Sequence, residues 1–357
     1  MQKKLIAIAV GATMVAAPMF AQADVKLKGQ IQVELTSVDG GKNADGTNRY
    51  DTVVRQGDYN SRSRWLIDAS KDLGNGLKAI GRLAFALDPS QGQDKGARDQ
   101  YVGLAGNWGA VVAGRLPTPY KMNGGVKWDP FVATFMQARQ QGGMSGTALG
   151  HNSFVNDVLA YVMPELGGIN ATFAYVASDD TDFSFGGEDW DISGTFTAGG
   201  TGKWGPVEVM LAYTKTGDPE LADGTSIEAF KQAKAGIRYK GNGLTAAYQY
   251  EDVDVSGPVR ADGLATGFTG SAGKFNFINL GYKFGNTLVA GNYGAFSAKQ
   301  DADQDTEYAA LGLKYFFDKK VTLHGGYTGI KVKGGDANPV GDKGKYNIWG
   351  IGMRYDF

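Results

Sequence analysis

The sequence predicts an all-β protein, a 16-stranded antiparallel transmembrane β-barrel. Three observations favour this class. Apolar and polar residues alternate in many segments, short connections alternate with long ones, and no apolar run after residue 23 is long enough for a membrane-spanning helix. Barrel strands cross a membrane by alternation, so their hydropathy signal is weak in any one segment.

The first 23 residues are typical of a secretory signal. Lys3 and Lys4 precede an apolar stretch at residues 5–20, and an A-x-A cleavage site follows at residues 21–23. The apolar stretch is short for a membrane span and is interrupted by Gly and Pro. We therefore expect a cleaved signal peptide over residues 1–23 and a single mature barrel domain over residues 24–357.

Alternation with a period of two is clearest at the two ends of the mature chain. Near the start, Val25, Leu27, Ile31, Val33 and Leu35 alternate with Lys26, Lys28, Gln30, Gln32 and Glu34. At the end, Trp349, Ile351, Met353, Tyr355 and Phe357 alternate with Gly350, Gly352, Arg354 and Asp356. A soluble β-sandwich also alternates. However, a packed core does not tolerate Lys and Arg on its polar face, and aromatic tips on the apolar face are typical of membrane interfaces.

The connections predict the number of strands. Seven short turns rich in Gly and Asn are expected at residues 72–77, 105–109, 164–168, 199–206, 240–244, 284–287 and 317–320. Long polar loops are expected near residues 38–60, 88–97, 116–150, 178–190, 215–230, 252–273, 298–306 and 333–345. Seven turns join fourteen strands, and the first and last strands make sixteen. This arrangement is typical of barrels with short periplasmic turns and long external loops.

A barrel of this size indicates a pore, because sixteen strands leave a water-filled lumen whereas eight are filled by side chains. Lys and Arg number 36 against 37 Asp and Glu, so no basic surface for nucleic acid is expected. The chain has no Cys, which excludes disulfides and thiolate chemistry. Phosphate-loop and hydrolase motifs are absent, so we expect neither a cofactor nor a resident metal, and no enzyme activity.

Several segments resemble the general porins of Gram-negative bacteria, in particular the β-proteobacterial type. Residues 61–85 (SRSRWLIDASKDLGNGLKAIGRLAF) resemble the first hairpin of that family, and residues 98–120 (RDQYVGLAGNWGAVVAGRLPTPY) resemble the next. Tyr161, Pro164 and Gly168 match a Y-x-x-P-x-x-x-G pattern, and the chain closes with GMRYDF as those porins do. Individual residues match the family in residues 61–120 and at the end of the chain. Elsewhere only the pattern is shared.

The resemblance implies a homotrimer in the bacterial outer membrane. Loop 3, at about residues 116–150, would fold into each barrel and narrow the pore. Small hydrophilic solutes and ions would then diffuse passively along their gradients. The implied partners are outer-membrane lipid, lipopolysaccharide with shared divalent cations, and the barrel-assembly machinery. That machinery would recognise the final strand through Trp349, Ile351, Met353, Tyr355 and Phe357.

The family pattern also implies pore-lining charges. The basic wall residues would be Arg64, Arg82, Arg98 and Arg115, and the loop residues would be Lys121, Lys127, Asp129 and Arg139. Arg82 is assigned by its phase opposite Leu83, and the orientation of Arg115 is open because the chain bends there. Each arginine could instead be a solvated surface residue.

Two departures from the family pattern bear on ion preference. The loop carries three cations but a single acid, and the arginine expected shortly before Tyr161 is missing, with Asp157 nearby. A positive constriction between low-dielectric walls favours anions.

Three other functions are compatible with parts of the sequence. A substrate-selective channel for phosphate or organic acids would use the same arginines as a ladder. A barrel enzyme would need a catalytic histidine, but the strand of His324 offers no partnering acid or serine on its face. An adhesin or receptor role of the loops is compatible with a pore.

Overall fold

A computed structural model describes most of the chain. The described residues are 23–42, 48–55, 63–146, 148–152, 154–177, 183–185, 188–217, 220–221, 229–254, 272–299, 305–333 and 344–357. The expected signal peptide lies outside this part except for its last residue.

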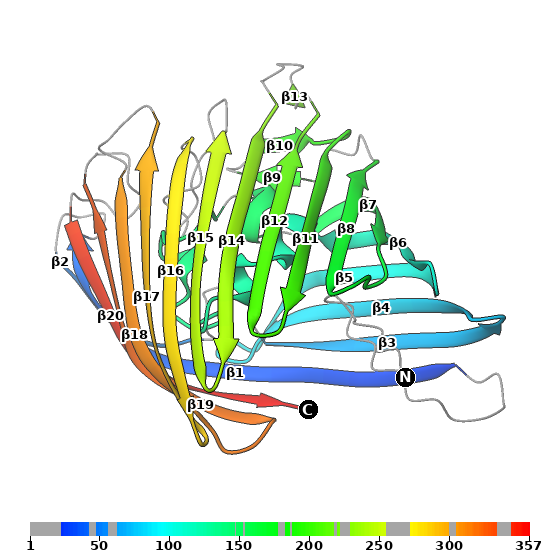
Figure 1. Ribbon diagram of the computed structural model, residues 1–357. Helices are drawn as coiled ribbons and strands as arrows, with labels where there is room; N and C mark the ends of the chain where they lie inside the picture. The colour runs from blue at the N-terminus through cyan, green and yellow to red at the C-terminus, as the bar shows by residue number, and fades with distance from the viewer. Residues whose placement is uncertain are drawn as a thin grey trace.

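Within the described part, sixteen antiparallel strands form a closed barrel (Figure 1). Each strand pairs with its neighbour in the ring, and β1 closes the ring by pairing with both β3 and β20. The strands in ring order are β1 Asp24–Lys42, β3 Ser63–Gly74, β4 Leu77–Asp88, β5 Gln93–Gly106, β6 Gly109–Pro117, β7 Phe154–Val162, β8 Ile169–Val176, β11 Phe196–Trp204, β12 Val207–Lys215, β14 Lys231–Gly241, β15 Leu244–Asp254, β16 Gly273–Phe284, β17 Thr287–Ala298, β18 Thr306–Phe316, β19 Val321–Val332 and β20 Gly344–Asp356. The predicted fold class and strand number are confirmed.

The two faces of the barrel wall differ as the alternation predicts. Large apolar side chains such as Leu211 and Ile351 point outward and are 68% and 64% exposed. Met210 and Thr214 of β12 lie in the opposite phase to Leu211, point inward and are 1% exposed. An apolar outer surface of this extent is stable only when lipid or another subunit covers it.

The seven short turns join their strand pairs at one end of the barrel, here called the turn end. Asn75-Gly76 and Asn242-Gly243 adopt positive φ angles of 51° and 77°, and of 51° and 80°, which suit two-residue hairpins. The turn predicted at residues 199–206 is shorter than expected, because only Gly205 and Pro206 separate β11 from β12. The glycines just before it lie inside strand β11, and one of them, Gly199, makes room for the side chain of Asn123.

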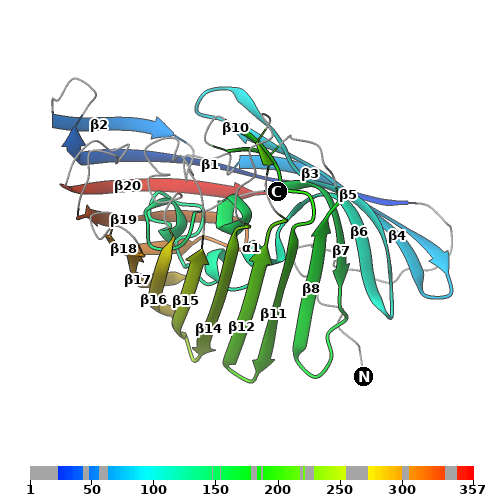
Figure 2. The same ribbon diagram turned by 90° about the horizontal axis from the view of Figure 1, so that it is seen from above.

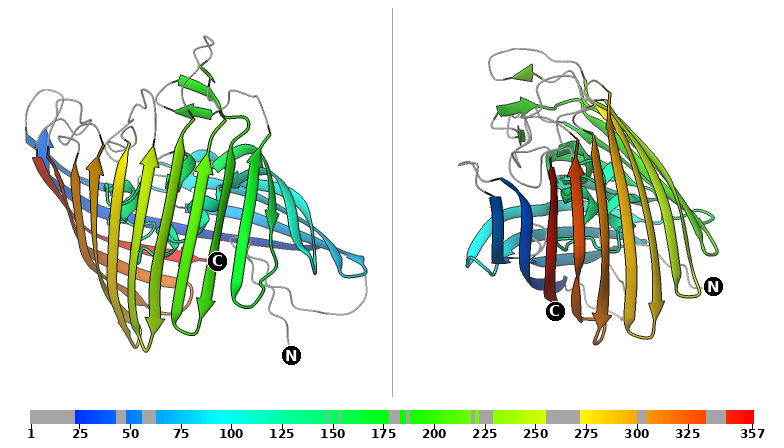
Figure 3. Two further views of the ribbon diagram at one scale, coloured as in Figure 1. Left: turned by 45° about the horizontal axis from the view of Figure 1, so that its top comes forward. Right: turned by 90° about the vertical axis from the view of Figure 1, so that its left-hand side faces the viewer.

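The long connections lie at the other end, here called the loop end, and three of them contain strands that the sequence did not predict. Residues 38–60, expected as a loop, include the end of β1 and a further strand, β2 Asn48–Arg55. β3 covers only the first part of the β1 edge, so β2 pairs with the rest, from Glu34 onward (Figure 3). A small sheet of β9 Phe183–Phe185, β10 Glu188–Asp191 and β13 Glu220–Leu221 stands at the loop end. Among the described residues, no helix is both long and apolar enough to cross a membrane.

Candidate pore constriction

The connection between β6 and β7, residues 118–152 and here called the lumen segment, lies within the ring of strands (Figure 2). It contains helix α1 Pro119–Met122 and the short helical turns η1 Gly125–Lys127, η2 Ala138–Gln140 and η3 Ala148–Asn152. Thr118 caps α1, because its side chain accepts a hydrogen bond from the N–H of Lys121 at 3.1 Å. Local capping therefore begins the segment where β6 ends.

Asp129 organises the middle of the lumen segment from within. Its carboxylate accepts hydrogen bonds from the N–H groups of Phe131 (2.7 Å) and Ala138 (2.8 Å) and from the Asn292 amide of β17 (2.8 Å). Burial raises the pKa of this carboxyl above its ordinary value, and the three donors oppose that rise. Predicted as a pore-lining acid, Asp129 is 4% exposed and bonded on both oxygens, so it acts as a scaffold residue.

Hydrogen bonds fasten the segment to the wall along several strands. The Trp128 indole donates to Glu208 of β12 at 2.9 Å, and the Phe135 N–H donates to Glu34 of β1 at 3.1 Å. Tyr308 of β18 donates to the carbonyl oxygen of Met136. These bonds satisfy backbone and side-chain groups that would otherwise be buried without partners.

Apolar packing reinforces the same attachment. Phe131, Phe135 and Met136 are at most 1% exposed and pack in one cluster with the wall residues Phe277 and Tyr308. Fully burying a side chain of this kind contributes roughly 1.5–3 kcal/mol relative to leaving it in water. The segment is therefore a packed element of the barrel interior.

Glycines in the wall allow the segment to approach closely. A Cβ on Gly294 would lie 2.5 Å from the Cα of Gly143, which is too close for any side chain. A Cβ on Gly199 would lie 2.5 Å from the side-chain nitrogen of Asn123. The Gly-rich stretch at residues 199–206 thus belongs partly to this contact surface, which explains why it is not all turn.

The wall formed by β3, β4 and β5 stands across the barrel from β12–β18 and carries most of the predicted arginines. Arg82 is 8% exposed and forms ion pairs with Asp68 (2.6 Å) and Asp99 (3.0 Å). Lys28 of β1 also contacts Asp68, at 2.9 Å. Two cations and two carboxylates therefore balance each other in this cluster.

Arg64 lies beside this cluster and, unlike Arg82, forms no ion pair within the described part of the chain; the charge of Asp99 acts on it from beyond ion-pair distance. It pairs in register with Gln30 of β1 and Ala86 of β4, and so shares their inward face. Among the described residues, it has neither an ion pair nor a hydrogen bond through its side chain. The neighbouring Arg354 is itself paired with Asp356 at 2.6 Å. The positive charge of Arg64 is therefore available to a mobile anion.

The remaining predicted cations lie near the start and end of the lumen segment or on its surface. The guanidinium of Arg98 and the ammonium of Lys121 both lie over the ring of Phe154, 4.7 and 4.1 Å from its centroid. Arg139 is half-buried and donates to the carbonyl oxygen of His151 at 2.7 Å. Lys127 is exposed.

Arg115, predicted to line the pore, lies on the other side of the wall. It pairs in register with Gln100, which pairs with the outward-facing Leu83. Its guanidinium donates to Asn156 at 2.5 Å. The register shifts at this point because Gly114 adopts a φ of 138°, and this kink prevents simple alternation from predicting the face.

The structure also adds residues that the site prediction did not include. Glu34 and Glu251 lie on the inward face, are fully buried, and accept hydrogen bonds from the lumen segment. Asp99 completes the pairing of Arg82. The sequence could have indicated these three acids, because they lie on the polar faces of alternating strands. Alternation does not show which acids the lumen segment covers.

The predicted assembly signal follows the outer face of the last strand. Trp349, Ile351, Met353, Tyr355 and Phe357 are 40–64% exposed. The final residue pairs with Gly29 through two backbone hydrogen bonds of 3.0 and 3.1 Å. Its ring fills the space where a side chain on Gly29 would stand. The chain end thus seals the junction between the last strand and the first.

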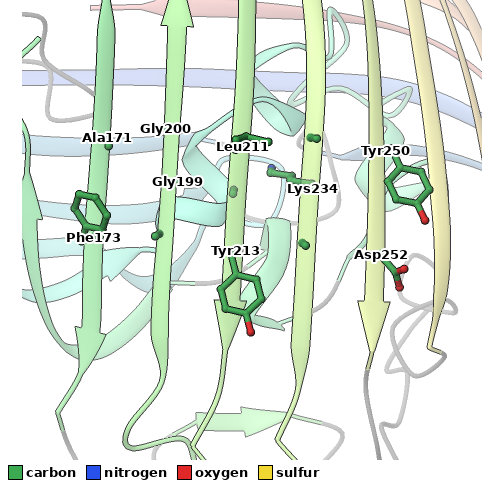
Figure 4. Close-up of a pocket in the computed structure, with 13 residues that line it drawn as sticks. Ala171, Phe173, Gly199, Gly200, Leu211, Tyr213, Lys234, Tyr250 and Asp252 are labelled. Atoms are coloured by element: carbon green, nitrogen blue, oxygen red, sulfur yellow. The ribbon is translucent and has the colours of Figure 1, made fainter. Parts of the chain in front are cut away.

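One pocket opens on the outer surface and is separate from the lumen. It is lined by small residues, including Ala171 and Gly200, between the larger Phe173, Tyr213 and Tyr250 (Figure 4). Most of these residues alternate with inward-facing ones, so the pocket faces the surroundings of the barrel. Among the described residues, no group of His, Asp and Glu is arranged to hold a metal ion.

A closed barrel with an apolar exterior and a charged lumen defines a membrane channel of the β-barrel class. A family model described as Gram-negative porin matches residues 7–335, and the chain belongs to that family. It is therefore an outer-membrane porin, a passive channel rather than an enzyme.

Similar proteins agree with this assignment. Outer membrane porin protein 32 of Delftia acidovorans is 28% identical over 355 residues, covering 97% of this chain and 93% of the relative. The major outer membrane protein P.IB of Neisseria gonorrhoeae is 26% identical over 345 residues, covering 90% and 91%. An anion-selective porin from Comamonas acidovorans has the same fold, with a TM-score of 0.70, 23% identity, and coverage of 94% of this chain and 100% of that chain.

Proposed function

We propose that this porin is a diffusion pore for small hydrophilic solutes and ions that prefers anions, with the lumen segment forming its constriction. The observation that carries the proposal is the inward-facing Arg64, which forms no ion pair among the described residues. An arginine beside a water-filled path between low-dielectric walls attracts anions and repels cations.

The positions of the acids support the same preference. Glu34, Glu251 and Asp129 are at most 4% exposed and are bonded to donors of the lumen segment or within it. Asp68 and Asp99 are paired with Arg82. These five acids are thus buried or paired and are not available to attract cations. The similar Comamonas structure is described as anion-selective, which agrees with this proposal.

The test is the reversal potential of purified wild-type protein in a planar bilayer across a potassium chloride gradient at pH 7. An anionic sign supports the proposal, and a cationic sign overturns it. Addition of phosphate distinguishes the runner-up: saturable block of the chloride current would indicate a substrate-selective channel, whereas a general pore shows none.

We further propose that the working form is a homotrimer in contact with outer-membrane lipid and lipopolysaccharide, with divalent cations shared between them. A similar structure, the trimer form of OmpT from Vibrio cholerae, has a TM-score of 0.62 and 18% identity and supports the assembly. The mass of the detergent-solubilised protein tests it: three chains are expected, and a single chain refutes it.

Two further parts of the proposal concern export. Residues 1–23 would be removed as a signal peptide, and the outward-facing residues of β20 that end at Phe357 would engage the barrel-assembly machinery. Sequencing the amino terminus of protein taken from outer membranes tests the first part, since Asp24 is the expected first residue.

A further inference from the structure

The two histidines of this chain both lie where the lumen segment meets the barrel wall. His151 belongs to the segment itself and is fully buried. His324 belongs to β19 and contacts Glu34, the carboxylate that receives the N–H of Phe135. An unperturbed imidazole titrates between about pH 5 and 8, so the protonation of His151 bears on how the segment docks.

The contacts of His151 determine its protonation state. Its Nδ1 is 2.7 Å from the carbonyl oxygen of Ser145, so Nδ1 carries a hydrogen and donates it. Its Nε2 is 2.9 Å from the Nζ of Lys234 on β14. When Lys234 is protonated its ammonium group only donates, so Nε2 must then offer a lone pair. The docked segment therefore requires a neutral imidazole.

The charges around His151 are mostly positive. Besides Lys234, the guanidinium of Arg139 donates to the backbone carbonyl of His151 at 2.7 Å. The positive charge of Lys121 acts on the imidazole from a greater distance. The facing carboxylate is Glu251 of β15, whose Oε2 is 3.7 Å from Nδ1. A proton on Nε2 would thus break one hydrogen bond and place two cations in contact.

Glu251 has little capacity left to stabilise such a proton. Its carboxylate already accepts hydrogen bonds from the Tyr120 hydroxyl (2.9 Å), the Ser145 hydroxyl (2.5 Å) and the Gln249 amide (2.8 Å). Burial, and then the charge of Lys234, lower the pKa of His151 well below its ordinary value.

We propose that His151 is a positioning residue of the lumen segment, and that acidification releases the segment from the wall because its docking on Lys234 requires the neutral imidazole. An exposed imidazole takes up a proton near pH 6.5. In the docked form His151 stays neutral at this pH, so undocking is linked to the uptake of one proton by its imidazole. The ratio of docked to undocked segment then falls about tenfold for each pH unit below about 6.5.

His324 contacts a different carboxylate. Its Nε2 lies 2.6 Å from Oε1 of Glu34. The two histidines can therefore be separated by experiment, although both lie at the attachment.

The experiment measures docking through a single introduced thiol, because the chain has no Cys. Met144, in the lumen segment, is fully buried, so the variant Met144→Cys reacts with a thiol reagent only when the segment leaves the wall. Lys127→Cys, on the exposed surface of the same segment, corrects for the effect of pH on the reagent. The corrected rate should rise by up to tenfold for each pH unit below about 6.5.

Histidine variants in the Met144→Cys background identify the source of this dependence. Glutamine can donate to the Ser145 carbonyl and accept from Lys234 but does not titrate, so His151→Gln should keep the segment docked and abolish the rise. His324→Gln should retain the rise. A flat rate in the parent, a rise that survives His151→Gln, or a rise that is lost in His324→Gln would each overturn the proposal.

A second measurement does not depend on the folding of His151→Gln. The His324→Gln variant retains one histidine, and nitrogen NMR of labelled protein then reports the tautomer of His151 alone. The expected signal at pH 7 is a neutral imidazole protonated on Nδ1. A cationic ring, or one protonated on Nε2, would refute the proposed docking contact.

Discussion

Replacing Arg64 with glutamine removes one positive charge from the lumen while leaving the nearby ion pairs intact. Arg82 remains paired with Asp68 and Asp99, and Arg354 remains paired with Asp356. Glutamine keeps much of the length and polarity of the side chain. The change in ion selectivity should therefore report the charge of Arg64 alone.

The magnitude follows from Coulomb's law. A charge about 5 Å from a passing ion contributes roughly 0.8 kcal/mol in water, and screening at about 0.1 M salt leaves about 0.5 kcal/mol. This energy enriches a monovalent anion about twofold and depletes a cation to the same extent. The Arg64→Gln variant should thus lower the ratio of anion to cation permeability by about fivefold, and less as the salt concentration rises.

The assay is the reversal potential of single channels across a salt gradient. Arg64→Lys keeps the charge and should keep most of the preference. Arg115→Gln is the matched control, because Arg115 lies on the outward face and its loss should leave the permeability ratio unchanged. An unchanged ratio in Arg64→Gln, or an equal loss in Arg115→Gln, would refute the reasoning.

Three further predictions test packing and assembly. Gly294→Val should displace the lumen segment, because even a Cβ there would lie 2.5 Å from the Cα of Gly143, and the single-channel conductance should change; the wild-type value would contradict the contact. Phe357→Ala removes the ring that covers Gly29 and should lower the yield of folded barrel, seen as loss of the fast-migrating band in unheated gels; an undiminished band would exclude this role. Gly76→Val forces a side chain into a φ of 77° and should cost about 1–3 kcal/mol of unfolding free energy, measured by urea titration; an unaltered midpoint would argue against strain at this turn.

Much of the fold was predictable because barrel strands follow a local rule. Alternation fixes which side chains face lipid, and Asn-Gly pairs fix tight turns such as Asn75-Gly76. The prediction was wrong where a residue serves a distant partner. Gly199 resembles a turn residue, but its missing side chain makes room for Asn123 of the lumen segment. β2 was missed because the free edge of β1 that it covers arises only once the ring has closed.

The site was predictable to a lesser degree. The inward phase of Arg82 followed from alternation, and its register with the inward Asp68 agrees. Alternation did not predict the positions of Asp129 and Arg115. The position of Asp129 depends on how the lumen segment folds on itself, and that of Arg115 depends on a kink at Gly114. The burial of His151 against Lys234 joins residues 83 positions apart, and no local pattern encodes such a contact.

The most direct test of the central claim is a comparison of two single-cysteine variants, because the native chain has no thiol. The claim is that the water-filled path runs along the wall that carries Arg64. An anionic thiol reagent should enter the pore, modify Arg64→Cys and reduce the current, and it should leave Arg115→Cys unaffected. Modification of Arg115→Cys with no effect on Arg64→Cys would contradict the account.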